Sequence, residues 1–200
     1  LWANTVKTSF GTALYIAYTG TGSTDNMIYN NYFYSGTGST VAVSINSAPN
    51  LKFYFNTIVC AGTYDYAMGI YHSSSSTGLA FVNNIVKTSL GLAAQFYQLA
   101  DFEPQRWDHN LYYSAGSQKV KLGSTVINSS FNWNQSTGDQ FSIFADPLLD
   151  GESYNLSAGS PARFAATIVN GIATDIEGNP RINIDLGCKE FQGTQGKTEK

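Results

Sequence analysis

The first half of the chain alternates apolar and small polar residues in short runs, and these runs return about every 27 residues. Within each run, a large apolar residue is followed two positions later by a small one. The large residues are Val6, Phe33, Ile58, Val86 and Tyr112, and the small ones are Thr8, Ser35, Cys60, Thr88 and Ser114. Side chains two positions apart lie on the same face of a β-strand, so the pattern predicts short strands with one buried face.

An asparagine precedes each large apolar residue by two positions. The five are Asn4, Asn31, Asn56, Asn84 and Asn110, spaced 27, 25, 28 and 26 residues apart. Asparagine tolerates the left-handed backbone conformation better than most residues, so we expect it at the sharp bend between two strands. If the bends stack, each amide donates to one neighbour and accepts from the next, which makes the asparagines a structural ladder. Chance recurrence of Asn in turns is the competing explanation.

Two further apolar columns keep nearly the same period. The second column consists of the pairs Leu14/Ile16, Val41/Val43, Met68/Ile70 and Ala94/Phe96. The third lies just before the asparagines and consists of Ile28, Phe53, Phe81 and Trp107. Three short strands per coil without helical periodicity predict an all-β solenoid, the parallel β-helix. We expect coils over residues 1–114, a capping segment of closing strands and loops around the C-terminal end over 115–192, and a flexible tail over 193–200.

Four motifs follow the coils in order. They are FADPLLD (144–150), YNLSAGSPA (154–162), TDIEGNPR (174–181) and DLGCKE (185–190). This series resembles the C-terminal closing segment of many secreted bacterial proteins of the pectate-lyase-like superfamily of right-handed parallel β-helices. It departs from the pattern at Cys188, where alanine is usual, and at Arg163-Phe164, where an acidic residue often stands. The resemblance implies the fold and a secreted or cell-surface location, but not one activity, because lyases, hydrolases and non-catalytic surface proteins share these motifs.

The chain starts inside a coil, with Asn4 already in place and no amphipathic helix before it. An uncovered solenoid end exposes apolar side chains and unpaired strand backbone. We therefore expect upstream coils or another chain at the N-terminal end.

The composition argues against two classes of partner, nucleic acid and the membrane interior. The net charge is -3 and charged residues make up 12 % of the chain, without a basic run, so nucleic acid is not an expected partner. No apolar stretch is long enough for a membrane span, so membrane insertion is not expected either. Cys60 and Cys188 are expected to be buried thiols, although a disulfide between them stays open.

Enzymatic candidates are few. Inverting glycoside hydrolysis needs two carboxylates, and only Asp65 is acidic where the second strand column begins. A polysaccharide lyase needs a base and a group that neutralises a uronate. The catalytic candidates are Lys52, as the base, and Arg106, as the group that binds the carboxylate. They are expected to lie about 10 Å apart, across two coils. The alternative is that both residues keep a β surface soluble.

No metal or cofactor is predicted. Calcium would need a cluster of acidic side chains on consecutive coils, which the sequence lacks, although calcium dependence stays open. The stretch 101–109 contains Asp101, Glu103, Asp108 and His109, without zinc-type spacing, and we expect an enlarged loop there. His72 has no acid aligned with it in the sequence.

Aromatic residues give the strongest functional signal. Trp2, Tyr29 and Tyr54 occupy equivalent outward positions on three coils, and Tyr15, Tyr71 and Tyr97 are expected to be outward on the adjacent column. Pyranose rings stack on aromatic faces, so Trp2, Tyr29, Tyr54, Tyr71 and Tyr97 are predicted to bind an extended glycan. Packing between coils is the competing explanation.

These observations predict a carbohydrate-associated β-helix protein that holds a polysaccharide along its coils. In one version it is the C-terminal part of a secreted lyase or glycoside hydrolase, with a lyase favoured over an inverting hydrolase. The alternatives are a non-catalytic glycan-binding module and a structural surface or adhesin solenoid. The sequence does not identify the substrate.

Overall fold

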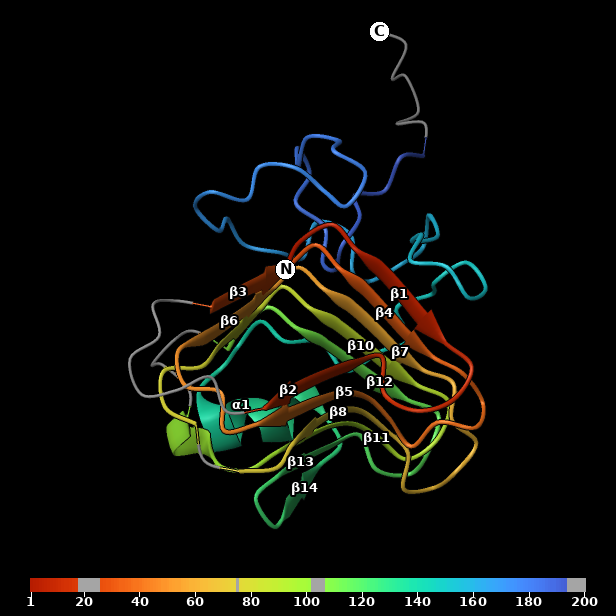
Figure 1. Ribbon diagram of the computed structural model, residues 1–200. Coiled ribbons are helices and arrows are strands. Elements are labelled where there is room, and N and C mark those ends of the chain that lie inside the picture. Colours follow the sequence, from red (N-terminus) through yellow and green to blue (C-terminus); the bar gives the residue numbers. More distant parts are fainter. Residues whose placement is uncertain (18–25, 75, 102–106, 194–200) are drawn as a thin grey trace, which may run out of the picture.

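The computed structural model describes residues 1–17, 26–74, 76–101 and 107–193, and it is a parallel β-helix (Figure 1). Sheet A consists of β3 (Asn26–Tyr29), β6 (Leu51–Tyr54) and β9 (Ala80–Val82). Sheet B consists of β1 (Thr5–Thr8), β4 (Tyr32–Ser35), β7 (Thr57–Cys60), β10 (Ile85–Thr88) and β12 (Leu111–Ser114). Sheet C consists of β2 (Leu14–Ala17), β5 (Val41–Asn46), β8 (Met68–His72), β11 (Leu92–Phe96), β13 (Val120–Leu122) and β14 (Thr125–Ile127).

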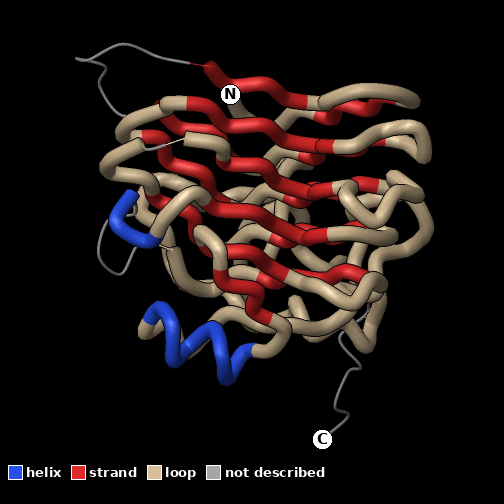
Figure 2. The backbone as a smooth tube through the Cα atoms, turned by 90° about the horizontal axis from the view of Figure 1, so that it is seen from below, coloured by secondary structure: helices blue, strands red, loops and turns tan. Residues whose placement is uncertain are grey.

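The register of the strands confirms the solenoid predicted from the repeat. In sheet B, the large apolar column pairs residue to residue from Val6 to Tyr112, and the small column pairs in the same way from Thr8 to Ser114. The strands of successive coils stack as parallel rungs (Figure 2). Among the strands of the described residues, β14 alone runs antiparallel to its neighbour, β13.

Aromatic rings form a continuous column inside the solenoid. Phe53 stacks on Phe81 with ring centroids 5.4 Å apart, and Phe81 meets Phe96 edge to face at 5.7 Å. Phe96 in turn contacts Trp133, which is fully buried. Apolar burial and ring packing therefore stabilise this part of the interior.

Trp133 belongs to the cap at the C-terminal end. It lies on α1 (Ser130–Thr137), where Ser129 caps the N-terminus and Gly138 takes the left-handed conformation that ends the helix. The Trp133 indole donates to Asp139 Oδ2 at 2.7 Å. This helix has no apolar periodicity because Trp133 is its one buried residue, and we did not predict it.

Residues 144–192, which we call the C-terminal cover, return along the side of the solenoid rather than extending over its end. They cross the outer faces of sheets A and B, as the teal-to-blue segment of Figure 1 shows. Leu156, Ala162 and Leu186 pack on Ile85 and Leu111 of sheet B, and Cys188 packs on Tyr32 and Tyr34. Strand β4 is consequently buried on both faces.

Buried carboxylates replace regular secondary structure within the cover. Asp175 Oδ1 accepts from the backbone N–H groups of Glu177 and Asn179, each at 2.9 Å. Asp185 accepts from Phe164 at 2.8 Å, and Glu190 accepts from Asp185 at 2.8 Å. The acidic residues of the last two sequence motifs therefore satisfy backbone donors, which is a structural role.

Candidate functional site

The asparagine column forms a ladder of side-chain hydrogen bonds. The Nδ2 group of Asn4 donates to Asn31 Oδ1 at 3.1 Å, and the same bond follows from Asn31 to Asn56 at 2.9 Å. It continues from Asn56 to Asn84 and from Asn84 to Asn110, each at 3.1 Å. At the capped end, the backbone N–H of Asn110 donates to the Ser142 hydroxyl at 3.0 Å.

The left-handed residue at this bend is one position earlier than we expected. Positive φ angles occur at Ala3, Asn30, Phe55, Asn83 and His109, not at the ladder asparagines. The bend turns these side chains outward, while the next residue's amide points along the ladder. The sequence signal was therefore correct about the place of the bend and wrong about which residue carries it.

The residues immediately before the ladder asparagines form a second column, which the sequence analysis missed. Three of them, Asn30, Phe55 and Asn83, contact the C-terminal cover. Asn30 Nδ2 donates to the Thr174 carbonyl at 2.6 Å. Asn83 makes two bonds with Thr167, one as donor at 2.8 Å and one as acceptor at 2.9 Å. Between them, the Arg181 guanidinium lies 3.9 Å from the centre of the Phe55 ring. A polar or aromatic residue immediately before four of the five ladder asparagines was the available signal, and Ala3 is the exception.

The cover buries part of the first aromatic column, which consists of Trp2, Tyr29 and Tyr54. Trp2 and Tyr29 stack with centroids 6.1 Å apart and planes 8° apart, and Trp2 is exposed. Tyr54, the next in the column, is only 4 % exposed because Ile172 of the cover packs in the same cluster. The prediction that Tyr54 offers a ring for a sugar to stack on is therefore wrong.

The proposed lyase residues do not assemble into a site in the described residues. Lys52 is 8 % exposed and its Nζ donates to the Gly78 carbonyl at 3.2 Å, a position that does not present the amine to a polymer. Arg106, its proposed partner, lies outside the described residues. Asp65 is exposed in a turn beside the stacked rings of Tyr64 and Tyr66.

His72 does have an acidic neighbour, contrary to the sequence expectation. Its Nε2 lies 3.8 Å from Asp101 Oδ2, and both side chains are buried. Burial lowers the pKa of His72, and the Asp101 charge acts in the opposite direction. The acid comes from η1 (Leu99–Asp101), which leaves the coil register, so alignment of repeats did not reveal it.

No metal site appears in the part of the chain that the structure describes, where no three His, Cys, Asp or Glu side chains cluster. Asp108 Oδ1 lies 3.3 Å from His109 Nδ1, and the His109 ring stacks on Phe141 at 4.4 Å. Glu103 lies outside the described residues. Both cysteines are free and buried, and burial raises the pKa of the Cys188 thiol to about 12. No helix among the described residues is long and apolar enough to cross a membrane.

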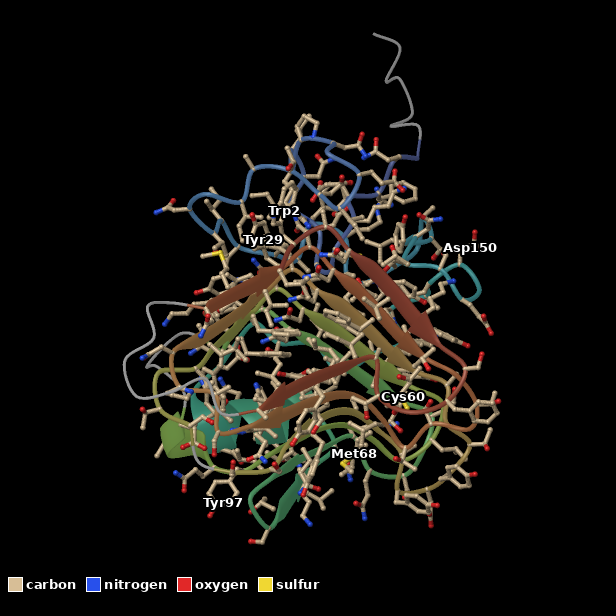
Figure 3. All side chains as sticks on the ribbon, in the orientation of Figure 1. Trp2, Tyr29, Cys60, Met68, Tyr97 and Asp150 are labelled. Atoms are coloured by element: carbon tan, nitrogen blue, oxygen red, sulfur yellow. The ribbon has the colours of Figure 1, made fainter. Side chains whose placement is uncertain are left out.

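The outer face of sheet C is different, because the cover lies on the opposite side of the solenoid (Figure 3). One outward column pairs Tyr15 with Ser44, Ser44 with Tyr71, Tyr71 with Gln95, and Gln95 with Lys121. Tyr15 is 62 % exposed, and the other four are partly exposed.

The rings on this face are arranged differently from the expectation. Ser44 separates Tyr15 from Tyr71, so these two rings lie two rungs apart, or about 10 Å. Tyr97, which is 48 % exposed, follows β11 two residues beyond Gln95 and lies one column over. The strands of sheet C contain no Asp or Glu. The face thus combines exposed rings, hydroxyl and amide groups and one cation.

Comparisons of the chain with protein families, curated proteins and solved structures found no match. The fold and the site define it as a parallel β-solenoid protein in which the C-terminal cover packs on the outer face of sheet B and, among the described residues, leaves that of sheet C open.

Proposed function

We propose that the chain binds an extended glycan along the outer face of sheet C, as a carbohydrate-binding parallel β-helix of the pectate-lyase-like type. The observation that supports it best is the set of outward rings, with Tyr15 and Tyr97 exposed and Tyr71 partly exposed, beside the Gln95 amide on a sheet whose strands contain no carboxylates. Sugar rings stack on aromatic faces, and amide and hydroxyl groups satisfy sugar hydroxyls.

The polymer runs across the coils in this proposal. Rings on rungs about 10 Å apart contact successive parts of one extended chain, whereas a small ligand would need a closed pocket. Lys121 at one end of the column favours an acidic polysaccharide over a basic one. The Trp2–Tyr29 stack on sheet A provides a second exposed platform. A secreted or cell-surface location suits such a ligand.

The test is affinity electrophoresis on a panel of neutral and uronic-acid polysaccharides. Tyr71→Ala and Tyr97→Ala are expected to weaken retardation at least about tenfold, the equivalent of 1.4 kcal/mol. Tyr66→Ala, which removes an exposed tyrosine from a turn outside sheet C, is the matched control. Retention of full affinity by both sheet C variants would contradict the proposal.

Product analysis by mass spectrometry on the same panel, with and without calcium, distinguishes binding from catalysis. Unsaturated fragments would add lyase activity and saturated fragments hydrolase activity. Binding without products supports a non-catalytic module.

A further inference from the structure

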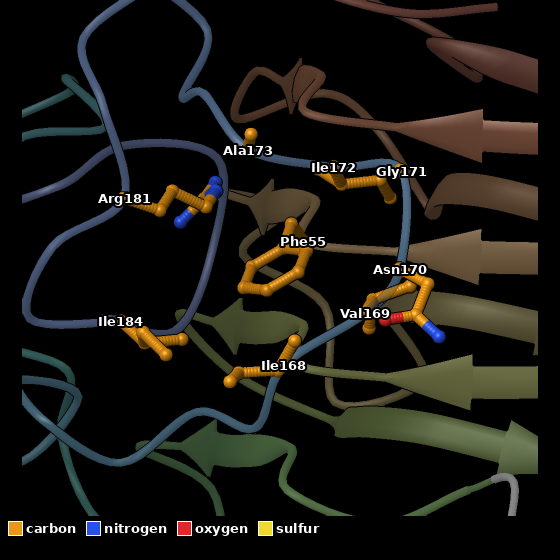
Figure 4. Close-up of a pocket in the computed structure, with 9 residues that line it drawn as sticks. All are labelled: Phe55, Ile168, Val169, Asn170, Gly171, Ile172, Ala173, Arg181 and Ile184. Carbon is orange, nitrogen blue, oxygen red and sulfur yellow. The ribbon is translucent and has the colours of Figure 1, made fainter.

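A cavity of about 290 Å³ lies where the C-terminal cover crosses the bend between sheets A and B (Figure 4). Its side chains come from that bend and from two parts of the cover. The large apolar ones are Phe55, Ile168, Val169, Ile172 and Ile184, and Arg181, Asn170, Gly171 and Ala173 also line the cavity. In Figure 4 they surround the Phe55 ring, with Arg181 and Ile184 on one side and residues 168–173 on the other.

The cavity follows from the left-handed bend. Phe55 has a φ of 51°, which directs its ring out of the solenoid and towards the cover. Asn30 and Asn83, at the equivalent positions of the neighbouring coils, hold the cover by hydrogen bonds on each side. The cover is thus fixed above and below Phe55, while Ile168 stays 74 % exposed at the rim.

Arg181 supplies the charged group of the cavity. Its Nη1 donates to the Asp185 carbonyl and to Glu190 Oε1, both at 3.2 Å, and its Nη2 donates to Asn30 Oδ1 at 2.8 Å. Its Nε is buried and has no hydrogen-bond partner among the described residues. Leaving a buried donor unsatisfied is unfavourable, so a ligand that brought an acceptor to this nitrogen would gain stabilisation.

We propose that this cavity binds a small molecule with an apolar body of one or two rings and a carboxylate or similar acceptor. Its volume is at the small end of the range for ligand pockets, about 300 to 1,000 Å³. In this proposal the Ile and Val side chains enclose the rings against Phe55, and the acceptor binds at Arg181, whose Nε has no partner among the described residues. A cationic group is disfavoured because it cannot accept a hydrogen bond and faces a guanidinium. The site is independent of the glycan face on sheet C.

The experiment uses 2-naphthoate as the probe, titrated against the full chain by ligand-observed saturation-transfer NMR. We expect saturable binding that weakens at least about tenfold in Ile168→Ser, whose exposed side chain can be removed without disturbing the fold. Phe131→Ser, on α1 and 71 % exposed, is the matched control and should bind like the wild type. Thermal unfolding of both variants checks that they are folded.

A second probe separates recognition of the acceptor from apolar adsorption. 2-Naphthylmethylammonium carries the same rings with a cation, and we expect it to bind at least about tenfold more weakly than 2-naphthoate. Three results would each overturn the proposal: no saturable binding of 2-naphthoate, equal affinity for the two probes, or equal loss in both serine variants.

Discussion

Sheets B and C are built from the same coils, yet their outer faces have different roles. On sheet B, the outward residues Tyr32, Ile85 and Leu111 are buried beneath the C-terminal cover. On sheet C, the outward residue Tyr15 is largely exposed and Tyr71, two rungs away, is partly exposed. The outward direction of an aromatic residue in a solenoid therefore does not predict whether its ring is exposed, because a segment distant in sequence can cover it.

The largest expected effect concerns the ion pair that holds the cover. Arg181→Met removes the partner of buried Glu190 and the contact with Phe55, and should lower the free energy of unfolding by about 3 to 5 kcal/mol. Urea denaturation followed by tryptophan fluorescence measures the change. Lys121→Met on sheet C is the control and should change stability by less than about 0.5 kcal/mol. Equal effects would remove the distinction between the two faces.

A cavity beneath the cover should have the next largest effect. Leu111→Ala truncates a fully buried side chain that packs with Leu156 and Leu186, and should cost about 3 kcal/mol. Gln95→Ala, at an outward position of sheet C, should be close to neutral in the same denaturation assay. A cost below about 1 kcal/mol for Leu111→Ala would show that the cover does not pack on sheet B.

The sequence predicted the coils well because each coil repeats one local pattern. The period of two within a strand and the repeat length between coils are sufficient to predict the columns from Val6 to Tyr112 and from Thr8 to Ser114. It failed at Tyr54 and His72, whose surroundings depend on residues outside the repeat pattern. It also failed at Lys52, whose amine donates to the Gly78 carbonyl of the next coil. No spacing rule gives the contact between Ile172 and the first aromatic column, because the cover has almost no regular secondary structure.

The burial of Tyr32 beneath the cover should make stability depend on pH in the alkaline range. Burial raises the pKa of Tyr32 above its ordinary value of 10.0, so the unfolded chain ionises first and stability falls as the pH rises above that value. Between about pH 9 and about pH 11, Tyr32→Phe should lose about 1 kcal/mol less stability than the wild type. Urea midpoints at the two pH values give the difference, which cancels the pH-independent loss of the bond from Tyr32 to the Glu152 carbonyl. Identical pH dependence in the two proteins would mean that Tyr32 is not desolvated.

The smallest expected change in stability is on sheet C itself. Tyr71→Ala should alter the free energy of unfolding by no more than about 1 kcal/mol, because its ring lies on the face away from the cover and is only partly buried. A larger loss would indicate that these rings stabilise the coils rather than bind a ligand. Thermal denaturation alongside the glycan assay separates the two roles.

Oxidative footprinting read by mass spectrometry, with and without polysaccharide, tests the division between covered and open faces most directly. Tyr15 and Tyr97 should be modified rapidly in the free protein, whereas Tyr32 and Tyr54 should be protected. A bound glycan should then protect Tyr15, Tyr71 and Tyr97 and leave the control Tyr66 unchanged. Modification of Tyr54 as fast as that of Tyr97, or no added protection of sheet C by any polysaccharide that the chain binds, would contradict the account.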